Sequence, residues 1–149
     1  MSKVFNKIIN GDCLLEIKRI PDKSFDLVFA DPPFNIGLKY DNYKDNLSYE
    51  EYYNWCEEWI KECFRILKET GSIYIAIGDE FVAEINIILK KIGFQFRNWI
   101  IWHYTNKVTP SLNHWQRTHE SILCCSKEKP HFNRDDVREP YTDTFLKNA

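Results

Sequence analysis

One tetrapeptide of this chain combines an acidic side chain, two prolines and an aromatic ring: Asp31-Pro32-Pro33-Phe34. It follows the apolar run 25–30, which predicts a buried strand that ends just before it. Open α/β sheets bind their ligands at this carboxyl end of their strands. The prolines fix φ at two successive positions and remove two backbone donors, so carbonyl groups and a carboxylate remain as acceptors. The tetrapeptide therefore predicts an acceptor site beside an aromatic ring.

The chemistry that suits such a site is the activation of an exocyclic amine on a nucleobase. The lone pair of this amine is delocalised into the ring, which makes the nitrogen a poor nucleophile. The Asp31 carboxylate and the Pro32 carbonyl would accept its two N–H groups and favour a tetrahedral nitrogen whose lone pair points at a methyl donor. Phe34 would stack on a base that has rotated out of the duplex. The alternative is structural: a Pro-Pro turn after a strand, with Asp31 as a helix N-cap.

The residues around the tetrapeptide resemble the β-group DNA amino-methyltransferases. The similarity covers roughly residues 7 to 141, and its motifs are specific as a set: 9–15, 20–28, 31–37, Gly71-Ser72-Ile73-Tyr74-Ile75, Ile100-Ile101-Trp102, His119-Glu120-Ser121-Ile122-Leu123 and Phe132-Asn133. In that family, Asp at the first motif position goes mostly with adenine N6 methylation, and Ser with cytosine N4 methylation. Phe34 stands where Tyr is more frequent, which keeps the stacking face and removes the hydroxyl.

The resemblance implies a site-specific enzyme that transfers a methyl group from S-adenosylmethionine to adenine N6 in double-stranded DNA, in a restriction-modification or orphan modification system. The residues that it implies are Asp31, Pro32, Pro33 and Phe34 for catalysis, and Asp12, Cys13 and Asp31 for the cofactor. DNA contacts are expected from Asn35, Lys107, His114 and Arg117, and no metal site is expected. His119 is interpreted as structural, and Glu120 as a residue that orients a loop. The alternative for Asp12 is a helix N-cap.

Other functions remain open at this point. The target could be cytosine N4, or a guanine in ribosomal RNA, whose methylases also use Asp-Pro-Pro-Phe. That RNA family places its glycine loop before the motif, and only 30 residues precede Asp31 here. A non-catalytic remnant or interaction module would keep the fold without binding a methyl donor. No His, Cys and Glu grouping has zinc spacing, which disfavours a hydrolytic deaminase.

The segments around the motif predict an α/β fold in which a mostly parallel sheet is covered on both faces. Strands are expected at 7–10, 25–30, 72–77, 94–104 and 121–126, and helices at 14–19, from 48 until Gly71, and at 80–91. The long helix starts with the capping box Ser48-Tyr49-Glu50-Glu51 and carries an aromatic stripe typical of core packing. The polar segment 35–47 is expected to form a loop over the site.

The glycine-rich loop with which the family holds S-adenosylmethionine is absent, since no two of the five glycines lie closer than seven residues. The family's strand order is 3-2-1-4-5-7-6, and the resemblance assigns strands 3 to 7 to this chain. We therefore predict a partial class I methyltransferase (Rossmann-like) sheet in a single partial catalytic domain, residues 1–149, without the glycine-loop half and the target-recognition region. Strand 25–30 would then expose an unpaired edge. A complementary polypeptide, or a second copy in a homodimer, is expected to dock there.

Composition limits these interpretations further. The chain has 149 residues, of which 44% are hydrophobic, as expected for a globular protein. It contains no apolar run long enough to span a membrane and no apolar signal segment, so a cytoplasmic protein is expected. The net charge is −2, but residues 94–134 hold six bases and two acids, so phosphate contacts are expected in that half. Five cysteines without a Cys-x-x-Cys pair predict reduced core residues.

Overall fold

A four-stranded sheet with the strand order β1-β2-β4-β3 forms the centre of the computed structural model, which describes residues 6–41, 43–105 and 112–140. The strands are β1 (Phe25–Ala30), β2 (Leu67–Ile77), β3 (Gln95–His103) and β4 (His119–Ser126). β1 and β2 are parallel, whereas β4 is antiparallel to both β2 and β3. The observed order matches the expected family order 4-5-7-6 for these strands.

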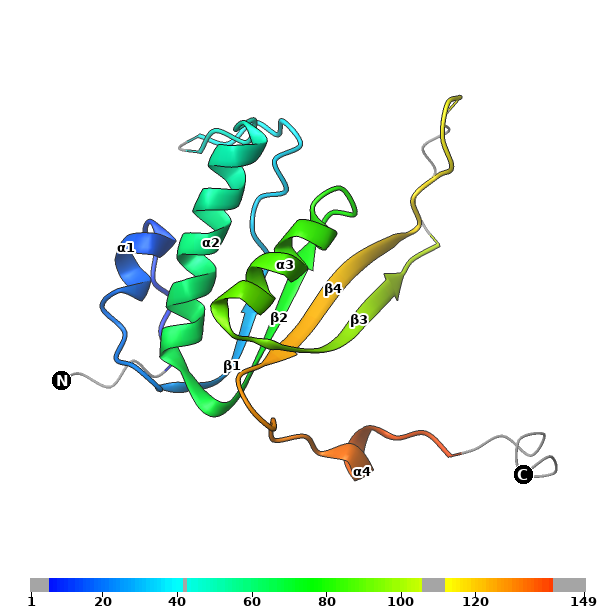
Figure 1. Ribbon diagram of the computed structural model, residues 1–149. Coiled ribbons are helices and arrows are strands. Elements are labelled where there is room, and N and C mark those ends of the chain that lie inside the picture. Colours follow the sequence, from blue (N-terminus) through cyan, green and yellow to red (C-terminus); the bar gives the residue numbers. More distant parts are fainter. Residues whose placement is uncertain (1–5, 42, 106–111, 141–149) are drawn as a thin grey trace.

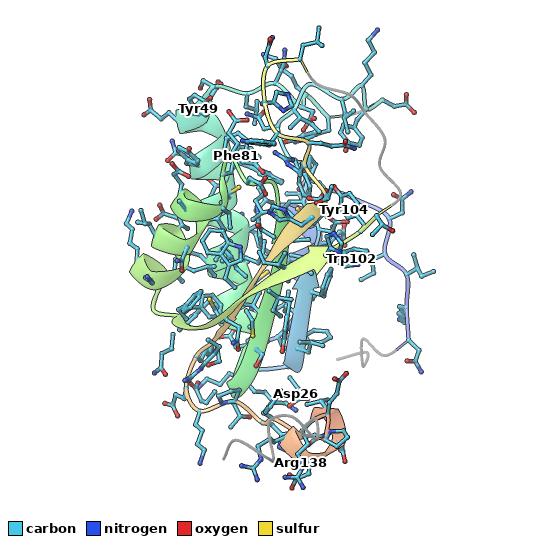
Figure 2. All side chains as sticks on the ribbon, turned by 90° about the vertical axis from the view of Figure 1, so that its right-hand side faces the viewer. Asp26, Tyr49, Phe81, Trp102, Tyr104 and Arg138 are labelled. Carbon is cyan, nitrogen blue, oxygen red and sulfur yellow. The ribbon has the colours of Figure 1, made fainter. Side chains whose placement is uncertain are left out.

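Helices lie on one side of this sheet. Figure 1 shows α2 (Tyr49–Ile66) and α3 (Val82–Ile92) across the sheet, with α1 (Cys13–Ile17) beside α2. The view turned by 90° in Figure 2 shows the sheet at one side of the helices. A fourth, short helix, α4 (Arg134–Val137), follows the last strand. The core between helices and sheet includes Ile73, Ile75 and Ile77 of β2, all fully buried.

The start of α2 was predicted correctly, but its end was not. The Ser48 side chain accepts from the Glu51 backbone N–H and the Glu51 carboxylate accepts from the Ser48 N–H, which completes the capping box. The helix ends at Ile66, because the backbone of Leu67 is extended, with φ −72° and ψ 141°. Leu67 pairs with Phe25 of β1, so β2 already begins there instead of at Ser72.

Two expectations about the sheet were wrong. It is mixed rather than mostly parallel, because β3 and β4 form an antiparallel pair and β4 returns along β2. The described helices cover one face only. By the strand register, Leu27 and Phe29 of β1 share the other face with Ile100 and Trp102 of β3, and all four side chains are exposed.

The expected first strand at 7–10 was also wrong. Among the described residues, this segment pairs with no strand, and the Ile8 side chain is fully exposed. A strand is stabilised by hydrogen bonds to a neighbour, and none joins this segment to another strand in the part of the chain that the structure describes. β1 is consequently an edge strand of the described sheet.

All five cysteines are free thiols, but only four are core residues. Burial raises the pKa of Cys56 and of Cys63 to about 12, which keeps both protonated and unreactive at neutral pH. Cys13 is exposed, contrary to expectation, because α1 buries none of its residues. Within the described ranges, no cluster of His, Cys, Asp and Glu is arranged to hold a metal ion, and no helix is long and apolar enough to cross a membrane.

Candidate active site

The Asp31-Pro32-Pro33-Phe34 motif lies directly after β1, as predicted, because this strand ends at Ala30. Two cavities adjoin it. The first has a volume of about 480 Å³ and is lined by Phe29, Asp31, Pro32, Pro33, Phe34, Ile36, Leu38, Tyr40, Ala76, Trp102 and Glu120. The second has a volume of about 330 Å³ and is lined by Cys13, Ile17, Val28, Phe29, Ala30, Asp31, Pro32, Pro33, Trp55, Trp59 and Cys63. Asp31, Pro32 and Pro33 line both, so the motif separates the two spaces.

The backbone of the motif is fixed by a residue of α2. The fully buried Tyr52 donates from its hydroxyl to the Pro33 carbonyl over 2.7 Å. Burial, more than any other cause, raises the pKa of Tyr52, so the hydroxyl keeps its proton and remains a donor. The Pro33 carbonyl is thereby occupied, which leaves Asp31 and Pro32 as the motif residues expected to accept an amine. Sequence reasoning treated Tyr52 only as core packing and missed this contact.

Phe34 lies against Gly78, which follows the end of β2. A Cβ added at Gly78 would stand 3.7 Å from Cδ2 of Phe34, an ordinary van der Waals distance, so the ring packs next to the end of this strand. The Phe34 ring is partly buried and forms part of the wall of the larger cavity. This placement suits the stacking role predicted for Phe34.

The loop over the site is held by a buried carboxylate. Asp45, only 2% exposed, accepts from the backbone N–H groups of Asn35 at 2.9 Å, Ile36 at 3.2 Å and Leu38 at 2.9 Å. Hydrogen bonds to a charged acceptor are stronger than neutral ones, and three of them satisfy this buried charge. Ile36 and Leu38 are cavity walls, so Asp45 shapes the cavity from behind. The sequence predicted the loop but not this anchor.

Asn35 braces the same loop. Its side-chain amide donates to the Leu47 carbonyl at 2.9 Å, and its side-chain oxygen accepts from the Leu47 N–H at 2.7 Å. Its backbone is left-handed, with φ 56°, a conformation that Asn tolerates better than most residues. Both polar groups of the side chain are therefore engaged within the protein, whereas the sequence predicted that Asn35 contacts DNA.

Glu120 forms part of the wall of the larger cavity and pairs with Trp102 in the strand ladder. Its Oε1 accepts from the Tyr104 hydroxyl at 3.2 Å, while its Oε2 is buried and finds no hydrogen-bond partner in the described part of the chain. Figure 2 shows Trp102 and Tyr104 at the end of β3, away from Asp26 at the start of β1. Glu120 is thus a second acidic residue of the cavity, a position that the sequence alone did not indicate.

Arg117 and His119 converge on Asp79, which follows β2. The Arg117 Nε lies 2.9 Å from one carboxylate oxygen of Asp79, and the His119 Nε2 lies 3.6 Å from the other. The ion pair fixes Arg117 to the end of the sheet that carries the motif. His114, a further predicted DNA contact, is exposed, and its Nδ1 lies 2.9 Å from the Trp115 carbonyl oxygen. Lys107 lies outside the described residues.

Asp12 caps the N-terminus of α1, which is the structural alternative considered for it. Its Oδ1 accepts from the N–H groups of Leu14 at 2.8 Å and Leu15 at 3.3 Å, which makes it the N-cap of α1. It does not follow a strand, since 7–10 forms none. Cys13 lies in the second cavity together with Asp31. Partial burial, followed by the Asp12 charge, raises the pKa of the Cys13 thiol.

Two features define the class of this protein. The first is the α/β sheet, and the second is an Asp-Pro-Pro-Phe motif that lies at a strand end beside two cavities. The chain belongs to the N6/N4 DNA methylase family, whose model matches residues 25–147.

Curated relatives agree with this family. The chain is 35% identical over 137 residues to the type II methyltransferase M.HpaI of Haemophilus parainfluenzae, covering 90% of this chain and 43% of that protein. It is 36% identical over 132 residues to the DNA adenine methyltransferase YhdJ of Escherichia coli strain K12, covering 87% of this chain and 45% of that protein. The chain thus spans less than half the length of these relatives.

Solved structures share the fold. The TTHA0409 protein of Thermus thermophilus, a putative DNA modification methylase in complex with S-adenosyl-L-methionine, is 25% identical with a TM-score of 0.62, covering 92% of this chain and 57% of that one. The cytosine-N4-specific PvuII DNA methyltransferase has a TM-score of 0.70 at 20% identity, covering 93% of this chain and 59% of that one. The similarity therefore extends over nearly all of this chain and confirms the predicted partial Rossmann-like methyltransferase fold.

Proposed function

We propose that this chain carries the amine-activating part of a DNA methyltransferase that uses S-adenosylmethionine and modifies adenine N6. The observation that carries the proposal is the position of Asp31 and Pro32, which face two cavities at the carboxyl end of β1. One cavity suits the target base and the other suits part of the methyl donor. The Asp at the first motif position and the adenine methyltransferase among the relatives favour adenine over cytosine. Cytosine N4 remains the alternative target.

In the larger cavity, the base would be held by contacts that this chain supplies. Phe34 stacks on the ring, and the Asp31 carboxylate and Pro32 carbonyl accept the two amine N–H groups. These acceptors draw the nitrogen toward a tetrahedral geometry, in which its lone pair no longer conjugates with the ring. A pair of acceptors that is fixed beforehand needs little reorganisation during the reaction. Tyr52 maintains this arrangement through the Pro33 carbonyl.

The second cavity fits part of S-adenosylmethionine, which supplies an electrophilic methyl group when bound. Its walls include Ile17, Val28 and Trp55, which suit a flat purine ring, and the Asp31 carboxylate lies at the same cavity. We assign Cys13 and Asp31 to contacts with the cofactor. Asp12 would act mainly as the cap that orients α1 beside the cavity. The glycine loop of the family is not among these residues.

The remaining contacts with the cofactor and with DNA would come from a complementary polypeptide that carries the glycine loop and the recognition region, or from a second copy of the chain. The unpaired edge of β1 and the exposed Leu27 and Phe29 beside it support this part of the proposal. An unpaired strand edge with apolar neighbours is a template for further strands. Double-stranded DNA is the proposed substrate, and the partial catalytic domain 1–149 would bind it together with that partner.

Photochemical cross-linking of radiolabelled S-adenosylmethionine tests the proposal that the second cavity binds this cofactor. Labelling of the chain, alone or with a complementary polypeptide, is expected, with competition by unlabelled cofactor. Cys13→Leu, which would fill part of the second cavity, should reduce labelling at least several-fold, whereas Asp26→Ala, at the opposite end of β1, should not. Equal labelling of the wild type and the Cys13 variant would contradict the assigned cavity. Absence of labelling under both conditions would favour a non-catalytic remnant.

Replacement of Tyr52 by Phe is expected to lower kcat about tenfold in the active enzyme that contains this chain. One net hydrogen bond is worth about 1 kcal/mol, and its partly buried carbonyl partner is left unsatisfied. KM for S-adenosylmethionine should change less than kcat, since Tyr52 supports the motif from behind and is not among the residues that line the second cavity. Steady-state kinetics measure both. Tyr53→Phe is the matched control, and an equal effect of both substitutions would show that the Pro33 contact has no special role.

A further inference from the structure

Two large apolar side chains between β3 and β4 are almost fully exposed. Leu112 is 99% exposed and Trp115 is 97% exposed, more than any other Trp side chain described. A Trp side chain buries 150–250 Å² when it packs, so an indole left in water forgoes a large hydrophobic gain. Neighbouring exposed apolar side chains are typical of a binding surface. We call residues 112–115 the Trp115 tip.

The Trp115 tip extends from the wall of the larger cavity. In the β3–β4 ladder, Trp102 pairs with Glu120 and His103 pairs with His119. One step further, the Tyr104 N–H donates to the Thr118 carbonyl over 2.9 Å. Trp102 and Glu120 line the cavity that contains Asp31, so the tip begins only a few residues beyond that wall. Figure 1 shows the described part of this loop projecting past the end of the sheet.

The charge around the tip suits a nucleic acid. Residues 104–118 contain no Asp or Glu, and they include Lys107 and Arg117. The wider region 94–134 has six bases and two acids, a net charge of +4 in a chain whose total is −2. The Asp79–Arg117 ion pair fixes the end of the loop to the sheet. The loop itself therefore presents no carboxylate to a polyanion, and the Asp79 carboxylate at its end is paired with Arg117, which favours DNA as the ligand.

We propose that Trp115, supported by Leu112, enters the DNA duplex beside the target base and fills the space that this base leaves. The proposal rests on the proposed function, in which the base occupies the cavity with Asp31. Apolar side chains that enter a duplex partly unstack it, and aromatic rings recover stacking energy with the neighbouring bases. The Trp115 tip would thereby offset part of the cost of extruding the base.

The test compares binding of the chain, mixed with the polypeptide that carries the glycine loop and recognition region, to two duplexes of identical sequence, one intact and one with a single abasic site. Aromatic stacking on a base is worth enough to change affinity about tenfold. The wild type is therefore expected to bind the abasic duplex about tenfold more tightly, since no base must be displaced before the indole enters. Trp115→Ala should bind both duplexes with similar affinity, and Trp115→Phe should keep most of the preference. Trp99→Phe, in β3, is the control and should behave like the wild type.

Each failure points to a different part of the proposal. If the wild type binds neither duplex in the presence of that polypeptide, both the DNA substrate and the insertion of Trp115 are contradicted. If the wild type binds DNA and Trp115→Ala keeps the full preference for the abasic duplex, only the inference about Trp115 fails. If the wild type binds both duplexes equally, the insertion is likewise contradicted, while the proposed methyl transfer stays intact.

Discussion

Replacement of Asp31 by Ala is expected to abolish methyl transfer, with a loss of at least about 100-fold in kcat, the scale seen when a fixed group that stabilises a transition state is removed. The carboxylate is one of the two predicted acceptors of the amine, and it lies at both cavities of the site. Without it, the nitrogen loses an acceptor that draws it out of conjugation. Transfer of a labelled methyl group by the active enzyme that contains this chain measures the effect.

Two variants separate this role from a loss of folding. Asp26→Ala removes an exposed aspartate of the same strand, paired with Lys68 at 2.7 Å, and should leave transfer unchanged. Asp31→Asn keeps the size of the side chain and one oxygen acceptor, so it should retain more activity than Asp31→Ala. Full activity of the Ala variant would contradict the assigned mechanism.

Replacement of Asp45 by Asn is expected to have the largest effect on stability, roughly 3 kcal/mol. Three backbone N–H groups donate to this buried carboxylate, and hydrogen bonds to a charged group are each worth about 1.5–3 kcal/mol. The amide that replaces it carries no charge and presents an NH₂ group to N–H donors. The midpoint of urea unfolding measures the loss of stability.

The same substitution should open the loop locally. Lys39 and Lys44, which pair through an isolated bridge in this loop, are sites for trypsin, and cleavage after them should become faster in Asp45→Asn. Asp41→Asn, an exposed change in the same loop, is the matched control and should alter neither unfolding nor cleavage. If both variants behaved alike, Asp45 would not be the anchor of the loop.

The elements that could be predicted from sequence are those with strong local signals. The strand 25–30 was placed correctly, because an apolar run ends abruptly at two prolines. The start of α2 was placed correctly by its capping box, whose hydrogen bonds connect residues only three positions apart. The motif could be assigned to a strand end for the same reason. Signals between residues close together in the sequence were therefore enough to predict the position of the motif.

The contacts that hold the site could not be predicted, because they join distant positions. Tyr52 reaches the Pro33 carbonyl from 19 residues away, and Asp45 reaches Asn35 from 10 residues away. In the sequence, Tyr52 looks like any aromatic residue of a helix core, and Asp45 looks like any acidic residue of a polar loop. The expected strand at 7–10 failed for a related reason: an apolar segment forms a strand only where a neighbour offers hydrogen bonds, and none is present among the described residues.

The proposed function is tested most directly by transfer of a tritiated methyl group from S-adenosylmethionine to unmethylated duplex DNA, followed by nucleoside analysis. The assay uses the purified chain alone and with a polypeptide that carries the glycine loop and recognition region. We expect label in N6-methyladenine when both polypeptides are present and none with the chain alone. Label with the chain alone would contradict the need for a partner, and label in N4-methylcytosine would contradict the target. Absence of label under both conditions would contradict the proposed methyl transfer itself.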